Sequence, residues 1–184
     1  RACPTGRAGR HVHDESMSRL HGSRVVVIDT ASADGRSAQL RHGVSLLVDG
    51  PTVAGLWFDG SGPDPATLDA TVIDASGATL IPGLVDSHAH LSLPGGARWV
   101  ERGADPTDEL LAAGEDNGEL MVRSGIRWAR DVGAPRRTLP DGRERALSLT
   151  LRDRWTGNPD RPYVRAAGTW LTRAGALPPG LVIE

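Results

Sequence analysis

The sequence predicts an α/β protein in two parts, a small β-sandwich over residues 23–82 followed by parallel β/α units over residues 83–184. Two observations support this fold class. The first part consists of short apolar runs with turn signals between them and has no helical period, which is typical of a small β-sandwich. In the second part, strand-like and helix-like segments alternate, which is typical of a parallel sheet covered by helices.

Five short strands are predicted in the first part. Residues 25–28 are β-branched and lie just before Asp29, as expected of a strand. The apolar runs at residues 44–48 and 53–58 flank an Asp-Gly turn, so they are expected to pair as a β-hairpin. The remaining two strands are expected at residues 71–74 and 79–81, on either side of a turn at Ser76-Gly77.

The second part is predicted to begin with a strand that ends in two histidines. A helix is expected to follow, with Asp105 as its N-cap, Pro106 in its first turn and Gly125 at its end. The stretch Gly114–Gly118 is a candidate break in this helix. The later elements are expected to be a strand at residues 126–131, a loop at 139–145, a helix at 146–155 and a strand at 162–167.

The composition is that of a soluble globular protein and excludes several classes of protein. Of the 184 residues, 39% are hydrophobic and 24% are charged, which argues against disordered and fibrous proteins. The formal charge of −2 provides no bulk attraction to nucleic acid or to lipid headgroups. Because no run of about 18 apolar residues is present, no span across a membrane is expected. We expect a cytoplasmic protein with a small-molecule substrate, and formation of a homo-oligomer is left open.

Two residue counts exclude particular chemistries. The single cysteine, Cys3, rules out an internal disulfide bond and a zinc site built from cysteines. All 21 basic residues are arginine. This stretch of chain therefore provides no lysine for a Schiff base, for a phosphate-binding loop or for a carbamylated bridge between two metals.

Residues 1–22 are expected to form a disordered leader. They lack the apolar run of about 7–15 residues that a secretory signal requires. Met17 is a candidate start, which would make the residues before it a translated extension. His11 and His13 have the spacing of metal ligands, but we interpret them as part of the leader.

His88 and His90 are the most informative residues of the second part. Alternate residues of a strand face the same side, so the two imidazoles are expected to project into one space, about 7 Å apart along the backbone. Neutral imidazole binds zinc, iron and similar metals, so the pair is a candidate metal site. Asp86 lies on the same face and is a candidate to orient a ligand histidine as a supporting carboxylate. The alternative is a pair of surface histidines that bind nothing.

The segment around these histidines resembles the signature of the amidohydrolase superfamily, namely Pro-Gly, two apolar residues, Asp, any residue, His, any residue and His. Pro82-Gly83-Leu84-Val85-Asp86-Ser87-His88-Ala89-His90 matches it at every defining position. The turn at Val48-Asp49-Gly50 and the segments at residues 123–133 and 161–168 are similar to further segments of the family. The resemblance spans roughly residues 23–170 and is to the branch that contains imidazolonepropionase-like and prolidase-like hydrolases.

The resemblance implies that the second part is the first three β/α units of an incomplete TIM (β/α)₈ barrel. His88 and His90 would then end the first barrel strand, at the face where active sites gather. Their implied role is to bind a divalent metal, with zinc as the first candidate and one or two ions, which lowers the pKa of a water molecule and polarises a carbonyl. The implied activity is metal-dependent hydrolysis of C–N bonds in non-peptide or dipeptide-type amides.

Two further residues are weaker candidates for substrate binding. Asp131 ends the second barrel strand, where it could contact substrate or support a ligand, although a salt bridge that fixes the loop explains it equally well. Arg98 follows a Gly-rich loop, where imidazolonepropionases bind the substrate carboxylate with an arginine, although the spacing here is shifted by one. The alternative for Arg98 is a solvated side chain. Trp99 and Trp170 are interpreted as packing residues.

The family site requires more groups than this chain contains. The implied set adds two histidines, a catalytic aspartate and, in binuclear members, a carbamylated lysine. No histidine follows His90, so the catalytic residues are expected beyond Glu184. A barrel of this kind normally needs about 250 residues. We therefore predict an N-terminal fragment of a hydrolase, inactive by itself. The alternative is a non-catalytic binding or structural module derived from the same fold.

Overall fold

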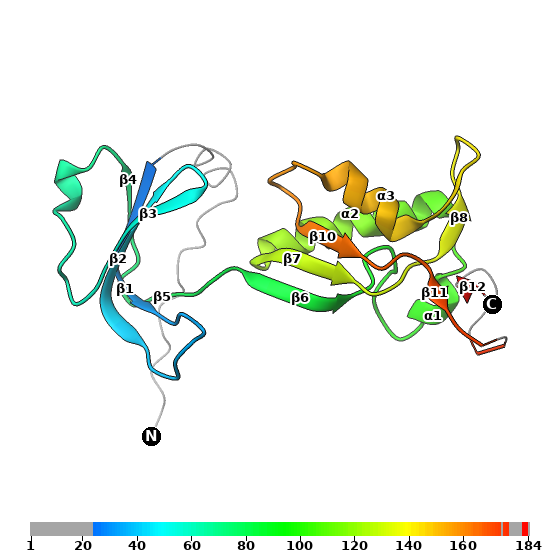
Figure 1. Cartoon of the computed structure of the whole chain (residues 1–184), viewed down its shortest axis with the longest axis horizontal. Coiled ribbons are helices and arrows are strands. Elements are labelled where there is room, and N and C mark those ends of the chain that lie inside the picture. Colours follow the sequence, from blue (N-terminus) through cyan, green and yellow to red (C-terminus); the bar gives the residue numbers. More distant parts are fainter. Residues whose placement is uncertain (1–23, 174, 177–181, 184) are drawn as a thin grey trace, which may run out of the picture. The chain divides into compact units, whose positions relative to one another are not determined.

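The computed structural model describes residues 24–173, 175–176 and 182–183. The predicted leader at residues 1–22, with Met17 and the two histidines near its start, lies outside the described residues. The chain forms two compact units, the first ending at Pro82 and the second beginning at Gly83 (Figure 1). Each unit has its own sheet, and the histidine pair lies in the second unit.

The described part of the first unit forms one five-stranded sheet. Its strands are β1 (Arg24–Ser32), β2 (Arg41–Asp49), β3 (Thr52–Trp57), β4 (Thr71–Asp74) and β5 (Thr79–Leu80), and a 3-10 helix spans Pro65–Thr67. β1 is antiparallel to β2 and parallel to both β4 and β5. The five predicted strands are therefore present, and β4 has the predicted bounds.

The predicted hairpin joins β2 and β3. Asp49 lies opposite Thr52, and Gly50 has a φ of +54°, a conformation that glycine adopts without the steric cost of a Cβ atom. Val26, Val44 and Leu47 are buried on this sheet. Because the strands described between residues 24 and 82 belong to a single sheet, the predicted sandwich of two packed sheets is not confirmed.

The second unit contains a three-stranded parallel sheet in the order β10-β7-β6. The strands are β6 (Leu84–Ala89), β7 (Ile126–Asp131) and β10 (Tyr163–Ala166), and the helices are α1 (Trp99–Arg102), α2 (Thr107–Arg123) and α3 (Leu147–Trp155). Two smaller pairs are β8 (Arg136–Thr138) with β9 (Glu144–Ala146), and β11 (Trp170–Leu171) with β12 (Val182–Ile183). The predicted α/β class is confirmed, with β6, α2, β7, α3 and β10 in the expected succession.

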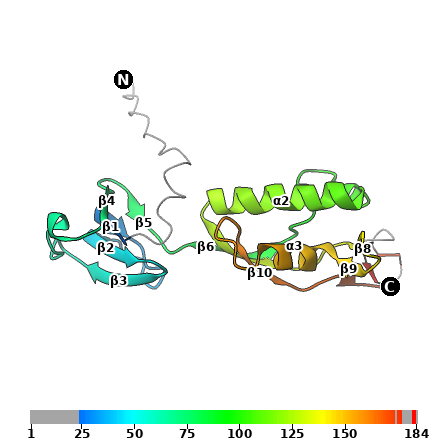
Figure 2. The ribbon, with the colours of Figure 1, turned by 90° about the horizontal axis from the view of Figure 1, so that it is seen from above.

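The two faces of the parallel sheet differ. On one face, Ala129 and Val164 are buried against leucines of α2 and α3, two helices that run alongside the strands (Figure 2). On the other face, Val85, Trp128 and Tyr163 lie in one row across β6, β7 and β10, and each is about half exposed or more. The helices of the described residues therefore cover one face of the sheet and leave an apolar row exposed on the other.

Helix α2 ends just before Gly125, as predicted, but its start and its middle differ from the prediction. Pro106 precedes the first helical residue, and Asp105 accepts a hydrogen bond from the Arg102 side chain instead of capping the helix. The helix is also continuous through Gly114 and Gly118. A Cβ atom on Gly114 would lie 2.4 Å from Leu151 Cδ1, so this glycine lets α3 approach closely. Packing between the helices thus outweighs the weak helix propensity of glycine.

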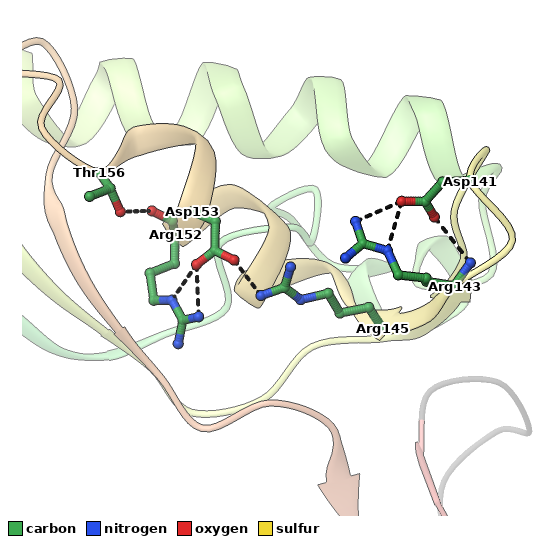
Figure 3. A network of polar contacts seen from close by, with 6 residues as sticks. All are labelled: Asp141, Arg143, Arg145, Arg152, Asp153 and Thr156. Carbon is green, nitrogen blue, oxygen red and sulfur yellow. Dashed lines mark hydrogen bonds and ion pairs between the residues drawn. The ribbon is translucent and has the colours of Figure 1, made fainter.

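The predicted loop at residues 139–145 is only partly confirmed, because the turn between β8 and β9 covers residues 139–143 and β9 begins at Glu144. Figure 3 shows that Asp153 of α3 lies between Arg145 and Arg152, while Asp141 pairs with Arg143 in the turn. The hydrogen bonds from Arg152 and Arg145 hold the pKa of Asp153 below its usual range. Because these pairs are exposed, they are expected to orient the hairpin on α3 more than to stabilise the unit.

No helix in the described part of the chain has both the length and the apolar character needed to cross a membrane.

Candidate functional site

The two histidines of the signature lie at the carboxyl end of β6, the first strand of the parallel sheet. Their ring centroids are 5.4 Å apart and the ring planes are nearly perpendicular, at 86°. Ala89 between them is buried in the core, and both histidines line one cavity. His88 is exposed and His90 is half-buried. The structure therefore brings the two predicted metal ligands together at one strand end.

Asp86 acts on the backbone of this segment. The register of β6 on β7 shifts between Asp86 and Ala89, so β6 carries one extra residue there, as in a β-bulge. The Asp86 carboxylate accepts a hydrogen bond of 3.0 Å from the backbone N–H of His88. From the sequence, this carboxylate was expected to orient a histidine ring. Among the described residues, its hydrogen bond is instead with the peptide N–H of His88.

The imidazole of His90 is fixed by a backbone carbonyl. Its Nδ1 lies 2.9 Å from the carbonyl oxygen of Gly133, just after β7. A carbonyl oxygen can only accept a hydrogen bond, so Nδ1 carries the proton in this contact and Nε2 of the neutral ring keeps a free lone pair. Such a hydrogen bond to the second ring nitrogen is the usual support of a metal-binding histidine.

Two tryptophans that were predicted to serve in packing contact the same ring. Trp99, the first residue of α1, stacks on His90 with a centroid distance of 5.8 Å and an interplanar angle of 9°. Trp170 of β11 lies at 5.1 Å from His90 with a tilt of 57°. The sequence contains no repeat or motif around either residue that would have indicated this contact.

Asp131, the last residue of β7, binds the backbone just after His90 and the backbone of Gly133, whose carbonyl contacts His90. Its side chain is fully buried, and its two oxygens accept hydrogen bonds from the Leu91 N–H at 2.8 Å and the Gly133 N–H at 3.0 Å. Burial raises the pKa of the Asp131 carboxyl above its usual range, and these amide bonds offset part of the shift. The ion pairs of the described residues do not include Asp131, so the salt bridge considered from the sequence is not observed.

Arg98 is not brought to the histidines. It is exposed and precedes α1, where its carbonyl accepts a hydrogen bond from the Arg102 N–H. The contacts of the described residues include none between the Arg98 side chain and His88 or His90. Its neighbour Trp99 reaches His90 instead.

A cavity of about 410 Å³ opens beside the histidines, between β6 and α2. Its lining includes Asp86, His88 and His90 on one side and Asn117 and Met121 of α2 on the other. The volume is in the range of small-molecule sites. The Asn117 amide donates hydrogen bonds to the carbonyls that follow His90, which holds the loop at the cavity wall.

The residues present fit a divalent cation in part. Two imidazoles at one strand end, one with its second nitrogen bonded to a carbonyl, are a suitable pair of nitrogen ligands for zinc. The described residues contain no group of three or more histidine, cysteine, aspartate or glutamate side chains placed to hold a metal. His88 and His90 are therefore two ligands of a set that the described residues do not complete.

The close contact between Gly133 and Trp170 leads to a testable prediction. A Cβ atom on Gly133 would lie 1.9 Å from Trp170 Nε1, so Gly133→Ala is expected to lower the free energy of unfolding by about 1–3 kcal/mol through overpacking. In a Trp170→Ala background the overpacking part of this cost is expected to disappear, while the part due to the φ of +152° at Gly133 remains. Urea denaturation of the two single variants and the double variant measures this coupling. Equal costs of Gly133→Ala in both backgrounds would show that the tryptophan does not restrict this position.

Comparisons with known proteins bear on the fold and on the matched sequence region. No family model matches the chain. A solved Xaa-Pro dipeptidase with methionine bound in its active site has a TM-score of 0.62 and 20% identity, over 81% of this chain and 34% of that chain. A solved amidohydrolase also has a TM-score of 0.62, with 19% identity, over 86% of this chain and 37% of that chain. These likenesses show a shared fold.

The sequence comparison identifies the branch. The imidazolonepropionase of Halobacterium salinarum is 35% identical over 118 residues, which are 61% of this chain and 28% of that protein. Over this matched region the chain is related to the amidohydrolase superfamily, in its imidazolonepropionase-like branch, as the signature predicted. The chain spans less than a third of the length of the curated relatives it matches.

Proposed function

We propose that this chain is the N-terminal part of a metal-dependent amidohydrolase that hydrolyses C–N bonds of a small-molecule amide. The observation that carries the proposal is the pair of imidazoles 5.4 Å apart at the end of the first parallel strand, with Nδ1 of His90 already bonded to a carbonyl. A divalent cation, with zinc as the first candidate and one or two ions, would be held by His88 and His90. When bound, such a cation lowers the pKa of a water molecule and polarises a carbonyl group.

The chain's own residues prepare this site in three ways. The Asp86 carboxylate holds the bulged peptide that carries His88. The Gly133 carbonyl holds the Nδ1 proton of His90 and leaves Nε2 available. Asp131 fixes the backbone on both sides of that contact. Because Asp131 is fully buried, it supports a ligand and does not contact substrate, whereas the exposed Arg98 remains a candidate for a substrate carboxylate.

The second unit is consistent with the start of a TIM (β/α)₈ barrel. Its three parallel strands carry helices on one face, and the exposed row of Val85, Trp128 and Tyr163 lies on the face that would line a closed barrel. A complete barrel needs about 250 residues, and residues 83–184 would account for its first three units. In this proposal, the general base and the remaining ligands belong to later strands of a longer polypeptide. We propose the cytoplasm as its compartment.

The test compares the 184-residue chain with a longer protein that contains it. Both are purified, and zinc content and hydrolysis of a panel of small amides and dipeptides are measured with and without a chelator. We expect chelator-sensitive turnover from the longer protein and none from the isolated chain. Amide hydrolysis by the 184-residue chain alone, with stoichiometric zinc bound, would contradict the proposal that this chain is inactive by itself. If the longer protein shows no chelator-sensitive turnover, the proposed hydrolase activity is wrong and a non-catalytic module is favoured.

A further inference from the structure

We propose that Trp170 and Trp99 are positioning residues that hold the His90 imidazole in a single orientation and tautomer, with Nε2 directed away from the backbone contact. This inference rests on the proposed function, since it concerns how a ligand histidine is prepared. It assigns a role to two side chains that the sequence pattern identified only as packing residues.

The three residues that surround the ring come from three different strand ends. Trp99 lies in α1, in the connection that follows β6, Gly133 follows β7, and Trp170 follows β10. The carboxyl ends of parallel strands lie at one edge of the sheet, so these connections converge there. His90 thus receives one contact from each of the three β/α units that the structure describes.

Trp170 acts on His90 by two routes. Its ring contacts the imidazole at 5.1 Å, and its indole Nε1 occupies the space where a side chain on Gly133 would begin. Gly133 is therefore enclosed by Trp170, while its N–H is bonded to the buried Asp131 carboxylate. With both constraints present, the Gly133 carbonyl keeps the direction in which it accepts the Nδ1 proton of His90.

Trp99 restricts the rotation of the His90 imidazole. Its indole is nearly parallel to the imidazole, so a rotation of His90 about its Cβ–Cγ bond would turn the imidazole edge into the indole. Such a rotation would exchange the positions of the ring nitrogens and carbons and would break the contact with Gly133. The stacking therefore favours the ring position in which Nδ1 meets the carbonyl. A ring already ordered in this way loses less conformational freedom when it binds a ligand.

The test has one readout without metal and one with metal. Without metal, long-range ¹H–¹⁵N NMR of the chain with ¹⁵N-labelled histidines reports the His90 tautomer at pH 8. With metal, the affinity for Co²⁺ is measured by titration, with quenching of tryptophan fluorescence as the signal. We expect the Nδ1–H tautomer in the wild type. Trp170→Leu and Trp99→Leu are expected to show mixed tautomers and Co²⁺ binding weakened about tenfold, the lower range for loss of a supporting residue. Trp170→Phe is expected to retain the wild-type tautomer.

Trp128→Leu is the matched control, because Trp128 is exposed on β7 and contacts Tyr163 instead of the histidines. It is expected to leave the His90 tautomer and the Co²⁺ affinity unchanged. If Trp170→Leu fails to fold, the exposed Trp99→Leu carries the same test. A wild-type tautomer and affinity in the leucine variants would overturn this inference. A wild type that shows the Nδ1–H tautomer, lost in Trp170→Leu, but binds no Co²⁺ would support the inference and overturn the proposed metal site.

Discussion

The double variant His88→Ala/His90→Ala is expected to lose metal binding by the chain. The two imidazoles are the adjacent nitrogen donors at the end of β6, so their removal leaves the strand end without a ligand. Loss of a single supporting residue around a metal ligand typically costs about 10–100-fold in affinity. Loss of both ligands is therefore expected to weaken Zn²⁺ binding by more than about 100-fold, as measured by metal analysis after dialysis and by competition with a chromophoric chelator.

His42→Ala provides the matched control for this prediction. His42 is an exposed histidine of β2 and belongs to the first unit, whereas the histidine pair belongs to the second. The control is expected to bind Zn²⁺ as the wild type does. Equal Zn²⁺ binding by the double variant and the wild type would show that His88 and His90 are not metal ligands. The proposed function would then lose its main support.

Asp131→Ala is expected to have the largest effect on stability. The change leaves the buried N–H groups of Leu91 and Gly133 without their acceptor, and each unsatisfied buried donor costs roughly 1–3 kcal/mol. Relief of the buried charge offsets part of this cost, because burial already raises the pKa of this carboxyl. We expect the free energy of unfolding to fall by about 2–4 kcal/mol, measured by urea denaturation at pH 7.

Two further variants define the origin of this effect. Asp131→Asn keeps one carbonyl acceptor and is expected to cost about half as much as Asp131→Ala. Asp116→Ala, an exposed position on α2, is the control and is expected to change stability by less than about 0.5 kcal/mol. A loss in Asp131→Ala no greater than in Asp116→Ala would show that the two hydrogen bonds do not hold the His90 segment.

The same carboxyl predicts a pH dependence. Its pKa is raised in the folded state relative to the unfolded value, so the folded state binds more protons between the two pKa values. The contribution of Asp131 to stability is therefore greatest below the unfolded pKa and decreases as pH rises through the folded pKa. Asp131→Asn is expected to flatten this part of the curve of unfolding free energy against pH. A curve of unchanged slope in the variant would assign the dependence to other groups.

Much of the fold could be predicted because it depends on local patterns. The bounds of β4 and β7 agree with the strands predicted at residues 71–74 and 126–131, and the Asp-Gly turn predicts the hairpin of β2 and β3. The α2 helix was correctly placed, but the candidate break at Gly114–Gly118 is absent, because these glycines were assessed by helix propensity alone. Their contacts with Leu151 and Trp155, on a helix much later in the chain, could not be read from a local pattern.

The sequence by itself determined the fold class, the family resemblance and the two histidines, because strand alternation places His88 and His90 on one side wherever the strand lies. Only the tertiary structure decided what surrounds them. Trp170, Gly133 and Asp131 reach His90 or the adjoining Leu91 N–H from later β/α units. Trp99 reaches the same ring from the connection that follows β6. Such contacts depend on how parallel strands align and how closely their loops approach, and neither property is encoded in the spacing of neighbouring residues.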